Sequence, residues 1–102
     1  MNLSDMMRYA QDMRDRFQRL QEELGAITVE GSSGGGMVYV TANGRQDILS
    51  VRIGREVVSP DDIEMLQDLV CAAVNDAIVR SRDLMASEIS NITGGALPPG
   101  LL

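Results

Sequence analysis

The stretch from residue 3 to residue 27 constrains the fold more than any other part of the sequence. Its apolar residues recur at alternating spacings of three and four, a heptad pattern that predicts a helix with one narrow apolar stripe. At about 1.5 Å per residue the helix would be roughly 33 Å long, too long for so short a chain to cover on all sides. The stripe therefore needs a partner, either a second helix of the same chain or the same helix of another chain. It consists of Leu3, Met6, Ala10, Met13, Phe17, Leu20, Leu24 and Ile27.

The ends of this first helix are predicted from local capping signals. Ser4 and Asp5 are possible N-terminal caps, and Gly25 is the residue type that commonly follows the last helical turn. We therefore expect the helix to span about residues 3–24.

From about residue 26 the apolar period changes to two, which predicts three short strands within about residues 26–54. Asn43-Gly44 is a strong signal for a hairpin turn, so the strands should form an antiparallel meander. The register after this turn stays open: a two-residue turn pairs Val40 with Asp47, whereas a longer turn passes through Gln46. The glycines at 34–36 lack the lysine and helix start of a phosphate-binding loop and predict a flexible connection or a close approach of another backbone.

The second helix is predicted over about residues 59–92. Ser59 is expected to be its N-cap and Pro60 its first residue, and the acidic residues that follow favour the positive end of a helix. Its apolar stripe is wide enough to cover one face of the sheet, and its far half should project beyond the sheet towards the first helix. Residues 94–102 are predicted to be an extended or disordered tail. The fold class is thus α+β, in one domain over residues 1–102.

Charge and composition limit the function. Fifteen acidic residues oppose nine basic ones, giving a net charge of -6, which disfavours general attraction to nucleic acid. All nine basic residues are arginine, which can hold phosphate bidentately, although the codon usage of a GC-rich genome would give the same bias. The chain has no His and a single Cys71, which we interpret as a small core residue rather than a nucleophile. We expect no metal, no cofactor, no enzyme activity, no membrane span and a cytoplasmic location.

The arginines differ in how many acidic residues lie within one helical turn. Arg14 and Arg82 have none, which makes them the first candidates for contacts to DNA phosphates. On the first helix Asp12 is expected to pair with Arg16, and Asp15 with Arg19, at a spacing of four. The other candidates must share their charge with nearby carboxylates, and they are Arg8, Arg16, Arg19 and Arg80. Arg45, in the predicted hairpin turn, is expected to lie away from the helices and to contribute little.

Several motifs together resemble the YbaB/EbfC family. Besides the heptad helix they are Val29-Glu30-Gly31-Ser32 with Gly34-Gly35-Gly36, Val40-Thr41-Ala42-Asn43-Gly44, Leu66-Gln67-Asp68-Leu69-Val70 continuing to Asn75-Asp76-Ala77, and Leu97-Pro98-Pro99-Gly100. The resemblance covers nearly the whole chain. It implies a bacterial nucleoid-associated protein whose helix-strand-strand-strand-helix monomer dimerises through its sheet and holds DNA between projecting helices, like tweezers.

Two functions follow as hypotheses. In the first, a homodimer in the nucleoid binds double-stranded DNA weakly, with salt sensitivity and little sequence specificity. In the alternative, the dimer is a protein-interaction module whose helices clasp another protein. A single helix cannot cover both the heptad stripe and the sheet, so a homodimer is expected in either case. Its predicted interface consists of Val38, Val40, Val51 and Ile53.

Overall fold

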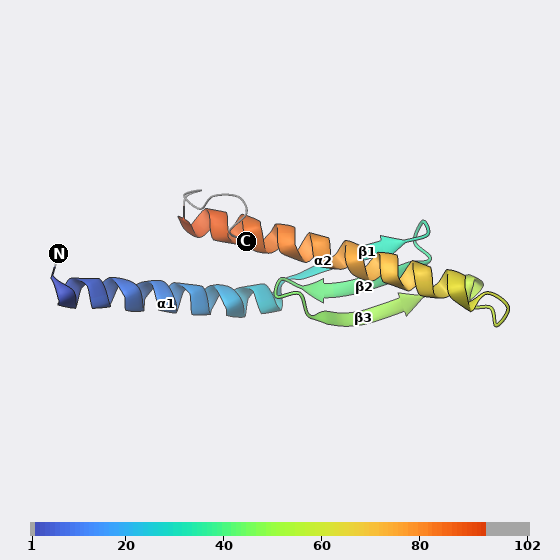
Figure 1. Cartoon of the computed structure of the whole chain (residues 1–102), viewed down its shortest axis with the longest axis horizontal. Coiled ribbons are helices and arrows are strands. Elements are labelled where there is room, and N and C mark those ends of the chain that lie inside the picture. Colours follow the sequence, from blue (N-terminus) through green and yellow to red (C-terminus); the bar gives the residue numbers. More distant parts are fainter. Residues whose placement is uncertain (1, 94–102) are drawn as a thin grey trace.

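The computed structural model describes residues 2–93, with side chains through residue 91, and it has the predicted α+β order (Figure 1). The predicted tail at 94–102 lies outside the described residues. The elements in chain order are α1 (Leu3–Ala26), β1 (Thr28–Ser33), β2 (Val38–Asn43), β3 (Ile48–Ile53), the 3-10 turn η1 (Arg55–Val57) and α2 (Ile63–Thr93).

The three strands form an antiparallel sheet in the order β1-β2-β3. Val40, in the central strand, pairs with Gly31 on one side and Val51 on the other. The two-residue turn is therefore wrong, and the longer turn is present: Gln46 has a φ of 69° and donates its N–H to the Asn43 carbonyl oxygen. A register shift in the β2–β3 pairing beside this turn absorbs the extra residue.

Helix α2 covers β1 and β2 and leaves β3 open (Figure 1). The core between them is small, with Val38, Val40, Ala42, Ala73 and Ala77 all completely buried. The close approach of another backbone occurs at Gly31 rather than in the glycine run at 34–36. A Cβ added to Gly31 would lie 2.3 Å from the backbone nitrogen of Ala77, so any side chain there would push α2 off the sheet.

Helix α1 begins and ends differently from the expectation. Its N-cap is Asn2, whose side chain accepts the N–H of Asp5, because Asn2 has the extended backbone that a cap requires. At the other end the helix continues through Gly25 to Ala26. The N–H of Ile27 donates to the carbonyl oxygens of Glu23 and Leu24, so the helix ends without a left-handed glycine.

Helix α2 begins four residues later than expected. Ser59 accepts the Asp61 N–H through its hydroxyl, which makes a local turn instead of a helix cap. Asp62 takes the capping position, because its carboxylate accepts the N–H of Met65. The cluster of helix-start residues was therefore recognised correctly, but its last member, not its first, caps the helix.

The molecule is elongated, with extents of 69 × 23 × 17 Å and a radius of gyration of 18.9 Å. A compact chain of this length would have a radius of gyration of about 13 Å. We divide the molecule along its length into two regions. The body consists of the sheet and residues 63–81 of α2, and the arm consists of α1 and residues 82–93 of α2. In the arm Leu20 and Leu24 pack against Ile89, with Leu84 and Met85 beside them. Among the described residues, no helix is both long and apolar enough to cross a membrane.

Candidate nucleic-acid interface

The hairpin between β2 and β3 joins the arm to the body. The Gly44 N–H donates to the Leu24 carbonyl oxygen at 2.8 Å, and the buried Ser81 hydroxyl donates to the Asn43 carbonyl oxygen at 2.7 Å. The Asn43 side chain also accepts the N–H groups of Arg45 and Asp47, which fixes the turn from inside. The hairpin is therefore held between α1 and α2.

This position corrects the expectation that Arg45 lies away from the helices. Its guanidinium lies against the end of α1, where a Cβ added to Gly25 would be 2.7 Å from Arg45 Nη2. Its Nε lies 3.8 Å from the carboxylate of Asp47, a distance at the limit of an ion pair. No residue pattern indicates this position, because only the tertiary contacts of the turn bring Arg45 to the base of the arm.

Of the four arginines on α1, only Arg16 has an ion pair among the described residues, to Asp12 at 3.2 Å. The pair expected between Asp15 and Arg19 does not form, and Arg8 has no carboxylate partner within 4 Å in the same part of the chain. At about 100° per residue, Arg14 lies on one flank of the apolar stripe, while Arg8 and Arg19 point to the helix face opposite the stripe. Three arginines of α1 thus have no ion pair among the described residues, more than the spacing of the charges indicated, and Arg19 shares a hollow with Asp15 and Glu22.

The two arginines of α2 differ as predicted. Arg80 Nε lies 3.2 Å from Asp76, and the same carboxylate accepts the backbone N–H of Ser32 at 3.0 Å. The Ser32 N–H, followed by the hydrogen bond from Arg80, lowers the pKa of Asp76 below its usual value. Arg82 has no ion pair among residues 2–91. It lines a hollow of about 290 Å³ together with Gln46 of the hairpin and with Asp83, Met85 and Ala86 of its own helix.

The sheet face opposite α2 is polar, and its arginine is already engaged. Arg52 lies 2.8 Å from Glu30, donates to the Thr41 hydroxyl at 3.3 Å and stacks 5.4 Å from the centre of the Tyr39 ring. A phosphate would have to displace these partners. This face is a weaker candidate than the arm.

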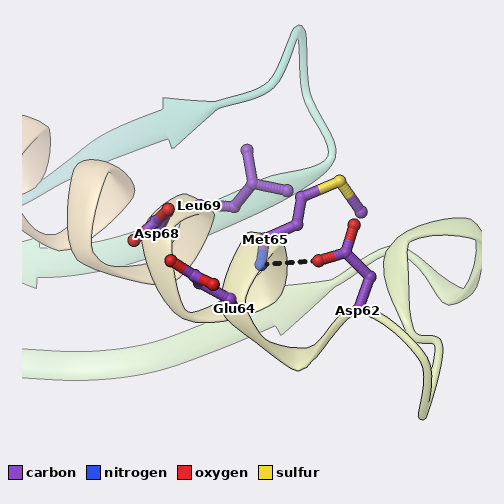
Figure 2. Close-up of a pocket in the computed structure, with 5 residues that line it drawn as sticks. All are labelled: Asp62, Glu64, Met65, Asp68 and Leu69. Carbon is purple, nitrogen blue, oxygen red and sulfur yellow. Dashed lines mark hydrogen bonds between the residues drawn. The ribbon is translucent and has the colours of Figure 1, made fainter.

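The beginning of α2, at the far end of the molecule, is acidic. A hollow of about 370 Å³ there is lined by Asp62, Glu64 and Asp68, with Met65 and Leu69 (Figure 2). Figure 2 shows the Asp62 carboxylate turned back to the Met65 N–H of its own helix. Residues 2–91 contain no cluster of three or more acidic or Cys side chains able to hold a metal ion. This end of the molecule would repel phosphate.

The predicted dimer residues fall into two groups. Val38 and Val40 are completely buried beneath α2 of their own chain, so they are not surface residues of the protomer and that part of the predicted interface needs correction. Val51 and Ile53 are 43% and 41% exposed, because α2 does not reach β3. Leu49 of the same strand is also exposed.

Cys71 is exposed and has only a distant contact, 3.7 Å from the Asn75 side-chain nitrogen. The interpretation of Cys71 as a core residue is therefore wrong for the protomer. The helical spacing of its apolar neighbours suggested burial, but the buried positions of this segment of α2 are Ala73 and Ala77.

Comparison with known proteins identifies the chain's relatives. The sequence profile of the YbaB/EbfC DNA-binding family matches residues 1–96. The chain belongs to this family. A nucleoid-associated protein of Syntrophobacter fumaroxidans is 53% identical over 95 residues, which cover 93% of this chain and 86% of that protein. A nucleoid-associated protein of Caldanaerobacter subterraneus is 50% identical over 100 residues, or 98% of this chain and 90% of that one.

Among solved structures, the crystal structure of the uncharacterized protein HP0035 from Helicobacter pylori resembles this chain with a TM-score of 0.81. The identity is 25%, over 91% of this chain and 98% of that one. The YbaB/EbfC resemblance and the fold class are confirmed. The family is one of DNA-binding, nucleoid-associated proteins and not of enzymes.

Proposed function

We propose that this family member acts in the bacterial nucleoid as a non-enzymatic homodimer that binds duplex DNA through arginine–phosphate contacts with little sequence preference. In the proposed dimer the two arms project from a shared body, and the DNA lies between them. Because the chain carries a net charge of -6, binding depends on local groups of arginines and should be weak and salt-sensitive.

The observation that carries this proposal is where the arginines without ion pairs lie along the molecule. All six candidate arginines lie on the two long helices: α1 carries Arg8, Arg14, Arg16 and Arg19, and α2 carries Arg80 and Arg82. The acidic hollow of Figure 2 lies at the end of the molecule opposite the arm. Arg8, Arg14, Arg19 and Arg82 have no ion pair among the described residues and rank first. Arg16 and Arg80 follow, because a phosphate must compete with Asp12 and Asp76 for them.

The uncovered strand β3 supports the homodimer. Its apolar residues Leu49, Val51 and Ile53 are all exposed, and β3 is an edge strand with one row of unpaired backbone groups. A second copy of the chain that covers this edge would bury the apolar side chains and pair the open backbone groups. We therefore propose β3, rather than β2, as the centre of the interface.

The interface is tested by two substitutions that the sequence alone could not separate. Val51→Asp should give a folded species of half the mass by light scattering at micromolar concentration. Val40→Asp should unfold the body, because it places an unpaired charge in the buried core. A parent protein that scatters only as an 11.1 kDa species would overturn the homodimer.

The DNA interface is tested by the double substitution Arg14→Ala with Arg82→Ala. If each protomer supplies these two contacts, the dimer makes about four, and the log–log salt slope of the parent should be roughly -3 to -4. The double variant should flatten this slope and weaken binding to unrelated duplexes equally. Arg55→Ala, at the far end of the molecule, is the matched control. An unchanged slope in the double variant would refute the roles of Arg14 and Arg82.

The alternative, a protein-interaction module, is favoured by one observation: the N-terminal half of α1 exposes Leu3, Met6, Met7 and Tyr9 to solvent at 55% or more. The two functions differ in a mobility-shift titration at low salt. A complete lack of binding to duplex DNA by the folded dimer would favour the protein-interaction function.

A further inference from the structure

The apolar stripe of α1 is covered at one end only. Leu20 and Leu24 are buried against α2, whereas Leu3 and Met6, nearer the N-terminus, are 72% and 55% exposed. Figure 1 shows the reason, since α2 ends beside the middle of α1 and the N-terminal half of α1 continues beyond it. A hollow of about 470 Å³ lies along this half and is lined by Met7, Ala10, Gln11, Arg14 and Asp15.

We propose that residues 94–102 of the same chain bind this uncovered half of the stripe. Helix α2 runs antiparallel to α1, and its Ile89 packs against Leu20, so its last residue, Thr93, lies about one turn further along, near the level of Phe17. The chain therefore leaves α2 at the point where the uncovered stripe begins.

The length of the segment fits the length of the stripe. Nine residues in an extended, proline-rich conformation span about 28 Å, and the stripe from Phe17 to Leu3 is about 21 Å long. At this rise Leu97 falls near Ala10, and Leu101 falls near Leu3. Gly94-Gly95 supplies the freedom that the chain needs to turn from the end of α2 onto the stripe.

The chemistry of the segment also fits. The sequence Gly-Gly-Ala-Leu-Pro-Pro-Gly-Leu-Leu contains three leucines and no charged residue, so it suits an apolar stripe and not a phosphate backbone. Pro98 and Pro99 restrict the unbound segment, which lowers the entropy lost when it binds. The contact would cover the stripe beside Arg14, which lines the hollow, and leave Arg8 and Arg19, on the opposite face of α1, open to DNA.

An engineered disulfide tests this placement in the full-length chain. In a Cys71→Ser background, Ala10→Cys is combined with Ala96→Cys, and the matched control combines Arg8→Cys on the opposite helix face with Ala96→Cys. In a glutathione redox buffer the first pair should form a disulfide within one chain, with an effective concentration at least about tenfold above the control. Circular dichroism checks that both variants are folded.

Two results would overturn the proposal. Equal effective concentrations for the two pairs would show that the segment does not prefer the stripe. A disulfide-linked dimer on a non-reducing gel would show that the stripe binds a second copy of the chain.

A second measurement uses the parent background: deletion of residues 94–102 should increase the fluorescence of a hydrophobic dye, and Leu3→Ser with Met6→Ser should abolish that increase. Neither readout depends on DNA.

Discussion

The body and the arm each pack α2 against another element, but they do so in different ways. In the body, β1 lies so close to α2 that Gly31 meets the backbone of Ala73 and Ala77. In the arm, α1 is held by the larger side chains of Leu20 and Leu24 near one end, and most of its length is open. Close backbone packing tolerates no added atoms, whereas a single layer of large side chains leaves surface for binding. The body fixes the fold, and the arm presents the candidate interface.

The largest effect should come from adding atoms to the body. Gly31→Ala places a Cβ 2.3 Å from the Ala77 backbone nitrogen and 2.6 Å from the Ala73 carbonyl oxygen, and backbone atoms cannot move aside alone. We expect the free energy of unfolding to fall by about 3 kcal/mol or more in a denaturant titration. Ser32→Ala, the neighbouring exposed position, should change it by less than about 0.5 kcal/mol. A stable Gly31→Ala variant would show that the body is not tightly packed.

The second effect should be large but local. Leu20→Ala removes a buried side chain from the thin contact of the arm, which should lower the opening free energy of α1 by about 3 kcal/mol. Amide hydrogen exchange should therefore become much faster in α1 and stay unchanged in β2. Gln18→Ala, on the exposed face, is the control. If exchange in β2 accelerated equally, the arm and the body would form one cooperative unit.

Much of this fold could be predicted because period and capping chemistry are local. The heptad stripe, the alternating strands and Asn43-Gly44 define the elements and their order. The helix starts were placed less well, because Ser59 and Asp62 are both good caps and only the structure decides between them. The close approach at Gly31 has no local signal, since it depends on which strand α2 crosses.

The candidate site was harder to predict for the same reason. Counting charges along a helix correctly separated Arg82 from Arg80, but it also paired Arg19 with Asp15, and that pair does not form. Spacing shows which residues can meet, and side-chain conformation decides whether they do. Val40 is buried beneath α2, whereas Val51 is exposed. This difference depends on how far α2 extends across the sheet, and no pattern of residues in the sequence indicates that distance.

A smaller effect should appear in acid. The pKa of Asp76 is lowered chiefly by the Ser32 N–H and then by Arg80, so its contribution to stability is present above the ordinary carboxyl pKa. That contribution is lost as the pH falls below about 4 and through the lowered pKa of the folded state. Asp76→Asn should be less stable than the parent at pH 7, and the difference should shrink by pH 2.

The control for this prediction is Asp68→Asn, at an exposed position of the same helix with no hydrogen bond or ion pair among the described residues. It should follow the parent at both pH values. If Asp76→Asn did the same, the link from β1 to α2 through this carboxylate would contribute nothing to the body.

The smallest effect should come from Cys71, which lies two residues from Ala73 on the same helix. Cys71 is exposed and Ala73 is completely buried, so Cys71→Ala should change the unfolding free energy of a monomeric Val51→Asp variant by less than about 0.5 kcal/mol. Ala73→Cys is the reverse substitution, at the position where α2 contacts Gly31. It should lower the unfolding free energy by about 1–3 kcal/mol in the same monomeric background. Repeating Cys71→Ala in the parent then tests the dimer. A cost that appears only there would place Cys71 in the subunit interface, whereas an equal, negligible cost in both would leave it on the free surface of α2.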